Sequence, residues 1–282
     1  MGRALMLRAK SMRGSLMYSE LSVLFRRRRT WAMLFTVALI PICLAFAVLA
    51  SGSTIPPGEG PPFLDRVSQN GLFVGFTAMI MAIPLFLPLT IGVVAGDTIA
   101  GEANTGTLRY LLIAPVNRAR LLVVKFFGAA AFCLAATFTL MITGIIIGAI
   151  LFPVGPVTLL SGDVVSIPAA LLRIFLVAIY VTISLLGLSA IGLFISTLTV
   201  IPVGAMAATV VVSTVTQILG ALPQIAVIHP YLISYYWLGF ADILRNPMDL
   251  GSMISNTLLQ LAYIAIFGSL AYSRFTTKDV LS

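Results

Sequence analysis

An uncharged run of 68 residues, from 174 to 241, is the feature that most limits what this chain can fold into. The run contains no aspartate, glutamate, lysine or arginine, and most of its residues are apolar. A membrane-crossing helix needs about 20 predominantly apolar residues, because the hydrocarbon core of a bilayer is about 30 Å thick. The run is therefore long enough for two such helices and for an apolar segment that follows them.

The rest of the chain has the same character. Of its 282 residues, 60% are hydrophobic and only 9% are charged, whereas soluble domains carry about 25% charged residues. We therefore predict an all-α integral membrane protein with one transmembrane domain over residues 1–282. Six helices fit into the charge-free intervals, near residues 31–50, 71–95, 122–151, 170–195, 200–221 and 252–272.

The basic residues predict the orientation of these six spans. With both termini in the cytoplasm, 14 of the 17 Lys and Arg residues lie on the cytoplasmic side, as the positive-inside rule requires. The other side keeps three basic and five acidic residues. The net charge of +8 thus follows from topology, and nucleic acid is not expected as a partner.

The basic N-terminal stretch, residues 1–29, precedes the first span and is too long for the basic region of a signal peptide. We expect it to be uncleaved and cytoplasmic. Met17, Leu21, Leu24 and Phe25 have the spacing of one helical face. They predict an amphipathic helix on the membrane surface, with Arg26 to Arg29 at lipid phosphates. An ordinary basic flank of the first span is the alternative.

Three Gly-x3-Gly spacings occur, and such spacings allow helices to approach closely. They are Gly71 with Gly75, Gly92 with Gly96, and Gly144 with Gly148. They indicate helix packing and do not identify a dimer surface.

Motifs for chemistry are missing from the sequence. Gly101 and Gly106 have the first spacing of a P-loop, but Thr107 stands where its lysine belongs. No His/Cys metal motif is present, and the single histidine, His229, lies beside an aromatic belt and is expected to be structural. Ion-coupled transporters use charged residues inside the membrane, and here Asp97, Glu102, Lys125 and Arg173 fall near the ends of the spans. The chain is not expected to be an enzyme by itself or to bind a cofactor or metal.

The segment between the second and third spans is the one long stretch of the chain that is polar enough to be exposed to solvent. A short helix, TLRYLLIA, is predicted over residues 107–114, with Thr105 or Thr107 as its cap and Pro115 as its end. Leu108, Leu111 and Leu112 line one face of it. A basic loop lying on the lipid surface is the alternative.

At this segment the chain resembles the membrane subunits of type-2 ABC exporters. The family pattern contains, in this order, a glutamate, Gly-Thr-Leu, a pair of leucines, a proline, an arginine and a lysine. The matching residues are Glu102, Gly106, Thr107, Leu108, Leu111, Leu112, Pro115, Arg118 and Lys125. Many members of the family have an acidic or polar residue at the position of Arg109. This difference bears on the contact with the partner.

The resemblance implies a permease in the cell membrane, a half-channel that pairs with a second, identical or different, permease subunit. Each of the two permeases would bind one separate ATPase subunit. The two copies of the ATPase would bind ATP and Mg²⁺. Residues 101–120 would contain the coupling helix that docks on the ATPase, with Glu102 fixing the loop. Residues 222–250 would form a re-entrant segment on the extracellular side.

The substrate is expected to be hydrophobic or amphipathic, such as a drug or a lipid, and to be carried out of the cytoplasm or the inner leaflet. An apolar, methionine-containing surface adapts to varied molecules. The candidates for lining the pathway are Phe73, Phe76, Met79, Met81 and Phe86. The same residues facing lipid would be the simpler explanation. An ion-coupled secondary transporter, an exporter of a polysaccharide or glycolipid, and a membrane scaffold remain as alternatives.

Overall fold

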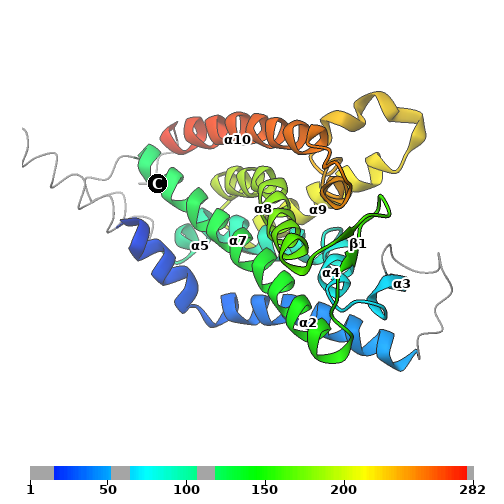
Figure 1. Cartoon of the computed structure of the whole chain (residues 1–282). Coiled ribbons are helices and arrows are strands. Elements are labelled where there is room, and N and C mark those ends of the chain that lie inside the picture. Colours follow the sequence, from blue (N-terminus) through cyan, green and yellow to red (C-terminus); the bar gives the residue numbers. More distant parts are fainter. Residues whose placement is uncertain (1–15, 52–63, 107–117, 278–282) are drawn as a thin grey trace, which may run out of the picture.

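The fold was analysed in a computed structural model, which describes residues 16–51, 64–106 and 118–277. Within these ranges the chain is almost entirely helical (Figure 1). An N-terminal helix covers residues 16–26. The elements that follow it are α2 (Arg28–Ala50), α3 (Leu64–Val67), α4 (Phe73–Ala82), α5 (Phe86–Asn104), α7 (Arg118–Leu151), β1 (Val157–Thr158), β2 (Val164–Val165), α8 (Ile167–Leu198), α9 (Pro202–Gly220), η1 (Pro223–Tyr231), η2 (Gly239–Leu244) and α10 (Gly251–Thr277).

Six of these helices are long and apolar enough to cross a membrane, namely α2, α5, α7, α8, α9 and α10. The predicted all-α membrane fold with six spans is therefore confirmed. The cytoplasmic orientation of the termini stays a prediction. The N-terminal helix and the end of α10 do lie at the same end of the bundle (Figure 1).

The second span differs from the single helix expected near 71–95. The chain leaves the helix after Ala82, and α5 begins at Phe86 and continues to Asn104. Pro84 explains the break, because proline lacks the N–H that an unbroken helix would bond at this position. The carbonyl oxygen of Pro84 accepts a hydrogen bond from the Gln217 side chain of α9, at 2.8 Å. The span-length helix is therefore α5, and α4 is a separate short helix.

Helix α8 is the centre of the bundle. Of the 18 residues in its most apolar stretch, 72% are buried inside the chain. In the corresponding stretches of α9 and α10, only 17% and 11% of the residues are buried. Helices α5, α7, α9 and α10 all pack against α8. Much of the surface of α9 and α10 is left for lipid or for other protein chains.

The Gly-x3-Gly pairs pack helices inside this chain. Gly71 and Gly75 lie against Gly148 and Gly144, so that the backbones of α4 and α7 touch. A Cβ atom added to Gly96 would lie 2.7 Å from the backbone nitrogen of Met206 in α9. These spacings therefore serve intrachain contacts.

The 222–250 segment lies at the end of the bundle opposite the N-terminal helix (Figure 1). It contains η1 and η2, and side chains of α8 and α10 donate hydrogen bonds to its backbone. Tyr180 Oη donates to the carbonyl oxygen of Tyr236, and Gln260 Nε2 donates to that of Ile233 at 3.1 Å. These bonds attach the segment to α8 and α10. Re-entry into the membrane stays a prediction.

Arg173 provides a further anchor for this segment. It lies in the second turn of α8, is 7% exposed, and donates through Nη1 to the carbonyl oxygens of Ile243 and Arg245. A charged donor bonded in this way contributes about 1.5–3 kcal/mol. We expect Arg173→Gln to lower the free energy of unfolding by about this amount, measured as a fall in the thermal midpoint of the purified chain in detergent.

Arg245→Gln is the matched control for this prediction. The Arg245 side chain is 61% exposed and forms an ion pair of 3.4 Å with Asp242. Exposed pairs of this kind contribute at most about 1 kcal/mol. Equal shifts of the midpoint in the two variants would show that Arg173 does not anchor the segment.

Candidate functional site

Lys125 is the centre of a charged cluster at the end of the bundle that carries the N-terminal helix. It lies two turns into α7, and only 2% of its side chain is exposed. Its ammonium group forms ion pairs with Glu102 of α5 and with Glu20 of the N-terminal helix, the latter at 2.7 Å. A buried ammonium group needs such partners, because its removal from water costs several kcal/mol. The cluster therefore joins α5 and α7 to an N-terminal helix that is distant from them in the sequence.

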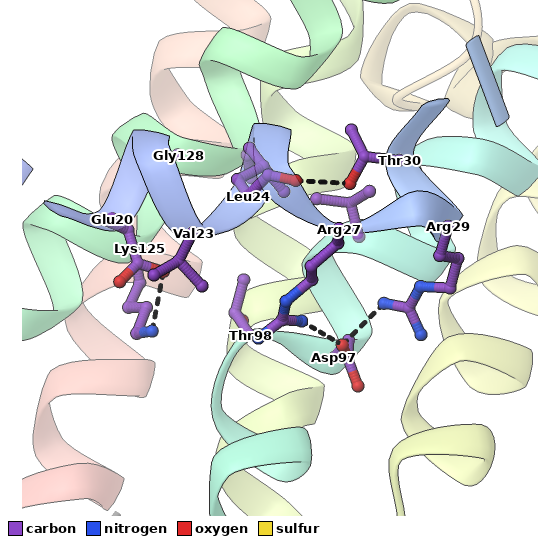
Figure 2. Close-up of a pocket in the computed structure, with 12 residues that line it drawn as sticks. Glu20, Val23, Leu24, Arg27, Arg29, Thr30, Asp97, Thr98, Lys125 and Gly128 are labelled. Carbon is purple, nitrogen blue, oxygen red and sulfur yellow. Dashed lines mark hydrogen bonds and ion pairs between the residues drawn. The ribbon is translucent and has the colours of Figure 1, made fainter. Parts of the chain in front are cut away.

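Asp97 forms a second cluster beside the first. Its Oδ2 atom accepts from Arg27 Nη1 at 3.0 Å and from Arg29 Nη2 at 2.6 Å. Both arginines are more than 40% exposed, and Asp97 is 12% exposed. Figure 2 shows these bonds and the Glu20 to Lys125 contact on one side of the N-terminal helix. The N-terminal helix is thus held by ion pairs at Glu20 near its middle and at Arg27 just after its end.

A break in the helix at Arg27 orients the side chains of Arg27 and Arg29. The backbone of Arg27 is extended, with φ −70° and ψ 127°, and separates the N-terminal helix from α2. The break leaves carbonyl groups at the end of the N-terminal helix without partners in the helix. Thr30 Oγ1 donates to the carbonyl oxygen of Leu24 at 2.6 Å, and Trp31 Nε1 donates to that of Phe25 at 2.8 Å. These two bonds stabilise the bend.

The expected contact of Arg26 to Arg29 with lipid phosphates stays a prediction, and the structure adds an acceptor within the chain for two of the four residues. The acceptor for Arg27 and Arg29 is Asp97, because the bend turns them toward α5. Arg26 and Arg28 are exposed.

The space between the two charged clusters is small. A cavity of about 30 Å³ lies between the N-terminal helix, α5 and α7, and Val23, Leu24 and Thr98 are among the residues that line it (Figure 2). This volume is close to that of one water molecule. The space between the two clusters is therefore a packed junction between helices. A larger, open pocket of about 490 Å³ lies beside it and is lined by Arg27, Asp97 and Glu102 among other residues.

The predicted coupling residues fall partly inside the described chain. Glu102 lies in the junction. Gly106 follows the C-terminal end of α5 and has a φ of +73°, a left-handed conformation that glycine adopts without strain. Arg118 Nη1 donates to the carbonyl oxygens of Phe275 and Thr276 at the end of α10, at 3.0 Å each. Thr107, Leu108, Leu111, Leu112 and Pro115 lie outside the described residues.

The candidate pathway residues divide into two groups. Phe73, Phe76 and Met79 are at most 5% exposed and belong to the core of the single chain. Met81 and Phe86 are 41% and 40% exposed and flank the break between α4 and α5. Contacts within the chain thus account for the first group, and the second group stays a prediction for the pathway. Among the described residues, no group of three His, Cys, Asp or Glu side chains is placed to hold a metal.

Sequence reasoning identified Glu102 and Lys125 but missed their partners. In the sequence, Arg27 and Arg29 belong to the basic stretch before the first span and Asp97 to the end of the second, and no pattern connects Glu20 with Lys125. The available signal was charge complementarity. Two acids, Asp97 and Glu102, follow the second span, and the basic stretch Arg26 to Arg29 precedes the first span. Periodicity within one helix carries no information on such contacts between helices.

The charged junction lies inside a region that matches a protein family. The family model described as "ABC-2 family transporter protein" matches residues 16–185, which are 170 of the 282 residues. The match begins at the N-terminal helix and ends within α8, so it contains all six residues of the two charged clusters. No curated protein matches the chain.

Proposed function

Because the chain belongs to the ABC-2 family of transporter proteins, we propose that it is the permease of an ATP-driven exporter and works with a separate ATPase. The family assignment makes it the non-catalytic membrane component of an ABC transporter. The proposal adds the direction of transport, the coupling site and the class of substrate.

The observation that carries the proposal is the position of the Lys125 junction. The 105–117 segment leaves α5 three residues after Glu102 and returns to the membrane at the start of α7. The ion pair between Glu102 and Lys125 joins the two helices at the base of this segment. A force applied to the segment is thereby passed to α5 and α7 together, and through Glu20 to the N-terminal helix. This is the arrangement that a coupling element requires.

We place the ATPase contact on the apolar residues of the segment, chiefly Leu108, Leu111 and Leu112. Both termini then lie in the cytoplasm, in agreement with the 14 of 17 basic residues assigned to that side. ATP and Mg²⁺ would be held by two copies of the ATPase, one for each permease.

The second permease, identical or different, would pack against the exposed face of α9. Val203, Val211 and Ile218 are each more than half exposed on this helix. The pathway would lie at the interface between the two permeases, and Met81 and Phe86 are the residues proposed to line it. Their apolar character favours a hydrophobic or amphipathic substrate, exported from the cytoplasm or the inner leaflet.

Leu111→Asp is expected to uncouple transport from ATP hydrolysis. A charge in the apolar face of a docking helix costs the contact at least about 1.4 kcal/mol, or a tenfold loss of affinity for the ATPase. Co-purification from the native host in mild detergent, with mass spectrometry of the bound chains, measures this loss. The wild type should bring down an ATPase that carries a P-loop.

Asn104→Asp is the control, since it adds the same charge at an exposed position just before the segment. It should leave co-purification unchanged. If neither the wild type nor the control retains an ATPase, or if transport runs on an ion gradient without ATP, the proposed function is wrong.

A further inference from the structure

An apolar groove runs along the outside of the bundle between α7 and α10. Its volume is about 500 Å³. The floor is formed by Ala190 and Leu193 of α8, which are 2% and 3% exposed. The walls include Val123 and Phe127 of α7, each about half exposed. All of its lining residues come from α7, α8 and α10, so the groove lies apart from the charged junction and from the exposed face of α9.

Gly268 keeps the wall on the α10 side open. A Cβ atom added to this glycine would meet no other atom within 4 Å. The groove is therefore unfilled at this point, and a larger side chain enters it without displacing the backbone.

The length of the groove matches one leaflet of a bilayer. On α7 it extends from Ala119 to Phe127, which is about 12 Å at a rise of about 1.5 Å per residue. Half of the hydrocarbon core is about 15 Å. The groove begins one residue after Arg118, the first described residue of α7, and overlaps the start of the third span, which is predicted near residue 122. One acyl chain lying along α7 has this reach.

Three basic residues are close in sequence to the residues that line this end of the groove. Arg118 and Arg120 flank Ala119, and the exposed Arg274 lies two residues after Tyr272. Arg118 is held by the carbonyl groups at the end of α10. The Nη2 atom of Arg120 is buried and has no hydrogen-bond partner within the part of the chain that the structure describes. A buried guanidinium nitrogen calls for an acceptor, and a phosphate oxygen is a strong one.

We propose that this groove binds one anionic phospholipid, with an acyl chain between α7 and α10 and its phosphate at Arg120 and Arg274. The lipid is a resident of the leaflet that faces the N-terminal helix. It ties α10, which packs loosely on α7, to the helix that follows the coupling segment. The inference needs only the membrane fold and does not depend on export.

Native mass spectrometry of the full-length chain tests the proposal. The protein is delipidated in detergent and then titrated with phosphatidylglycerol or with phosphatidylcholine of the same acyl chains. The wild type should bind one phosphatidylglycerol per chain, on the order of tenfold more tightly than phosphatidylcholine. Both lipids carry the phosphate, but the choline headgroup adds a positive charge that the basic residues repel. Gly268→Trp should lower phosphatidylglycerol binding by at least the same factor, because the indole fills the groove.

Ile266→Trp is the matched control. Ile266 lies on the same helix, is 56% exposed and does not line the groove. This variant should bind lipid like the wild type. Arg120→Gln should keep acyl-chain binding and lose the preference for phosphatidylglycerol.

The thermal midpoint and elution volume of each variant establish that it is folded, and Gly268→Leu replaces Gly268→Trp if the latter is not. Undiminished lipid binding in the folded groove-filling variant would overturn the site. Equal binding of the two lipids by the wild type would overturn the anionic headgroup. Neither result requires an ATPase, so both are separate from a failure of the proposed function.

Discussion

Lys125→Met is expected to destabilise the protein and to uncouple transport at the same time. The substitution leaves the carboxylates of Glu20 and Glu102 at one site without the cation that both of them bind. Breaking a buried ion pair by removing one partner costs about 3–5 kcal/mol. The two carboxylates are 25% and 17% exposed, so we expect a value near the lower end of this range, measured by thermal unfolding in detergent.

The loss of transport should exceed what the loss of folded protein explains. In proteoliposomes that also contain the ATPase, we expect transport per folded permease to fall by about 5- to 150-fold. Typical coupling free energies of about 1–3 kcal/mol correspond to this range. ATP hydrolysis should continue, because the ATPase sites are on the partner. The readout is the ratio of substrate moved to ATP hydrolysed.

An exchange of charges provides the control. Lys125→Glu combined with Glu102→Lys restores one ion pair at the base of the segment with its direction reversed. It should recover part of both the stability and the coupling that Lys125→Glu alone loses. A Lys125→Met variant that transports at the wild-type ratio would show that the junction is only structural.

The membrane fold was predictable because it depends on length and charge alone. A bilayer excludes unpaired charges from its core, so the intervals without charged residues mark the spans directly. The break at Pro84 was not predicted, although the proline is visible in the sequence, since hydropathy takes no account of a missing N–H group. The helix that follows the break, α5, continues to Asn104 and therefore carries Glu102.

The candidate site was predictable only in part. The family pattern singles out Glu102 and Lys125, which are 23 residues apart in the chain. It says nothing of Glu20, which comes to Lys125 from 105 residues away. That contact depends on the bend at Arg27 and on the packing of α2 against α7, and both are properties of the folded chain. The apolar coupling residues 107–115 lie outside the described residues and stay a prediction from the family pattern.

The contact of α4 with α7 predicts the second large effect, a loss of stability in Gly144→Ala. A Cβ atom at Gly144 would lie 2.6 Å from the Cα atom and 2.9 Å from the nitrogen of Gly75. These are backbone atoms, which have no alternative rotamer, so the two helices must separate. Overpacking of this kind costs about 1–3 kcal/mol, and here Gly71 and Gly148 would lose their contact as well. We expect a clear fall in the thermal midpoint in detergent.

Gly75→Ala makes the change from the other side of the same contact and should have the opposite result. A Cβ atom at Gly75 would lie 3.7 Å from the carbonyl oxygen and the sulfur atom of Met141, an ordinary van der Waals distance. Alanine also favours a helix by about 0.5–1 kcal/mol over glycine. The variant should therefore be as stable as the wild type or slightly more stable. Equal losses in the two variants would mean that α4 does not lie on α7 in this register, and the exposed Met81 and Phe86 that follow α4 would then lose their assigned place beside the pathway.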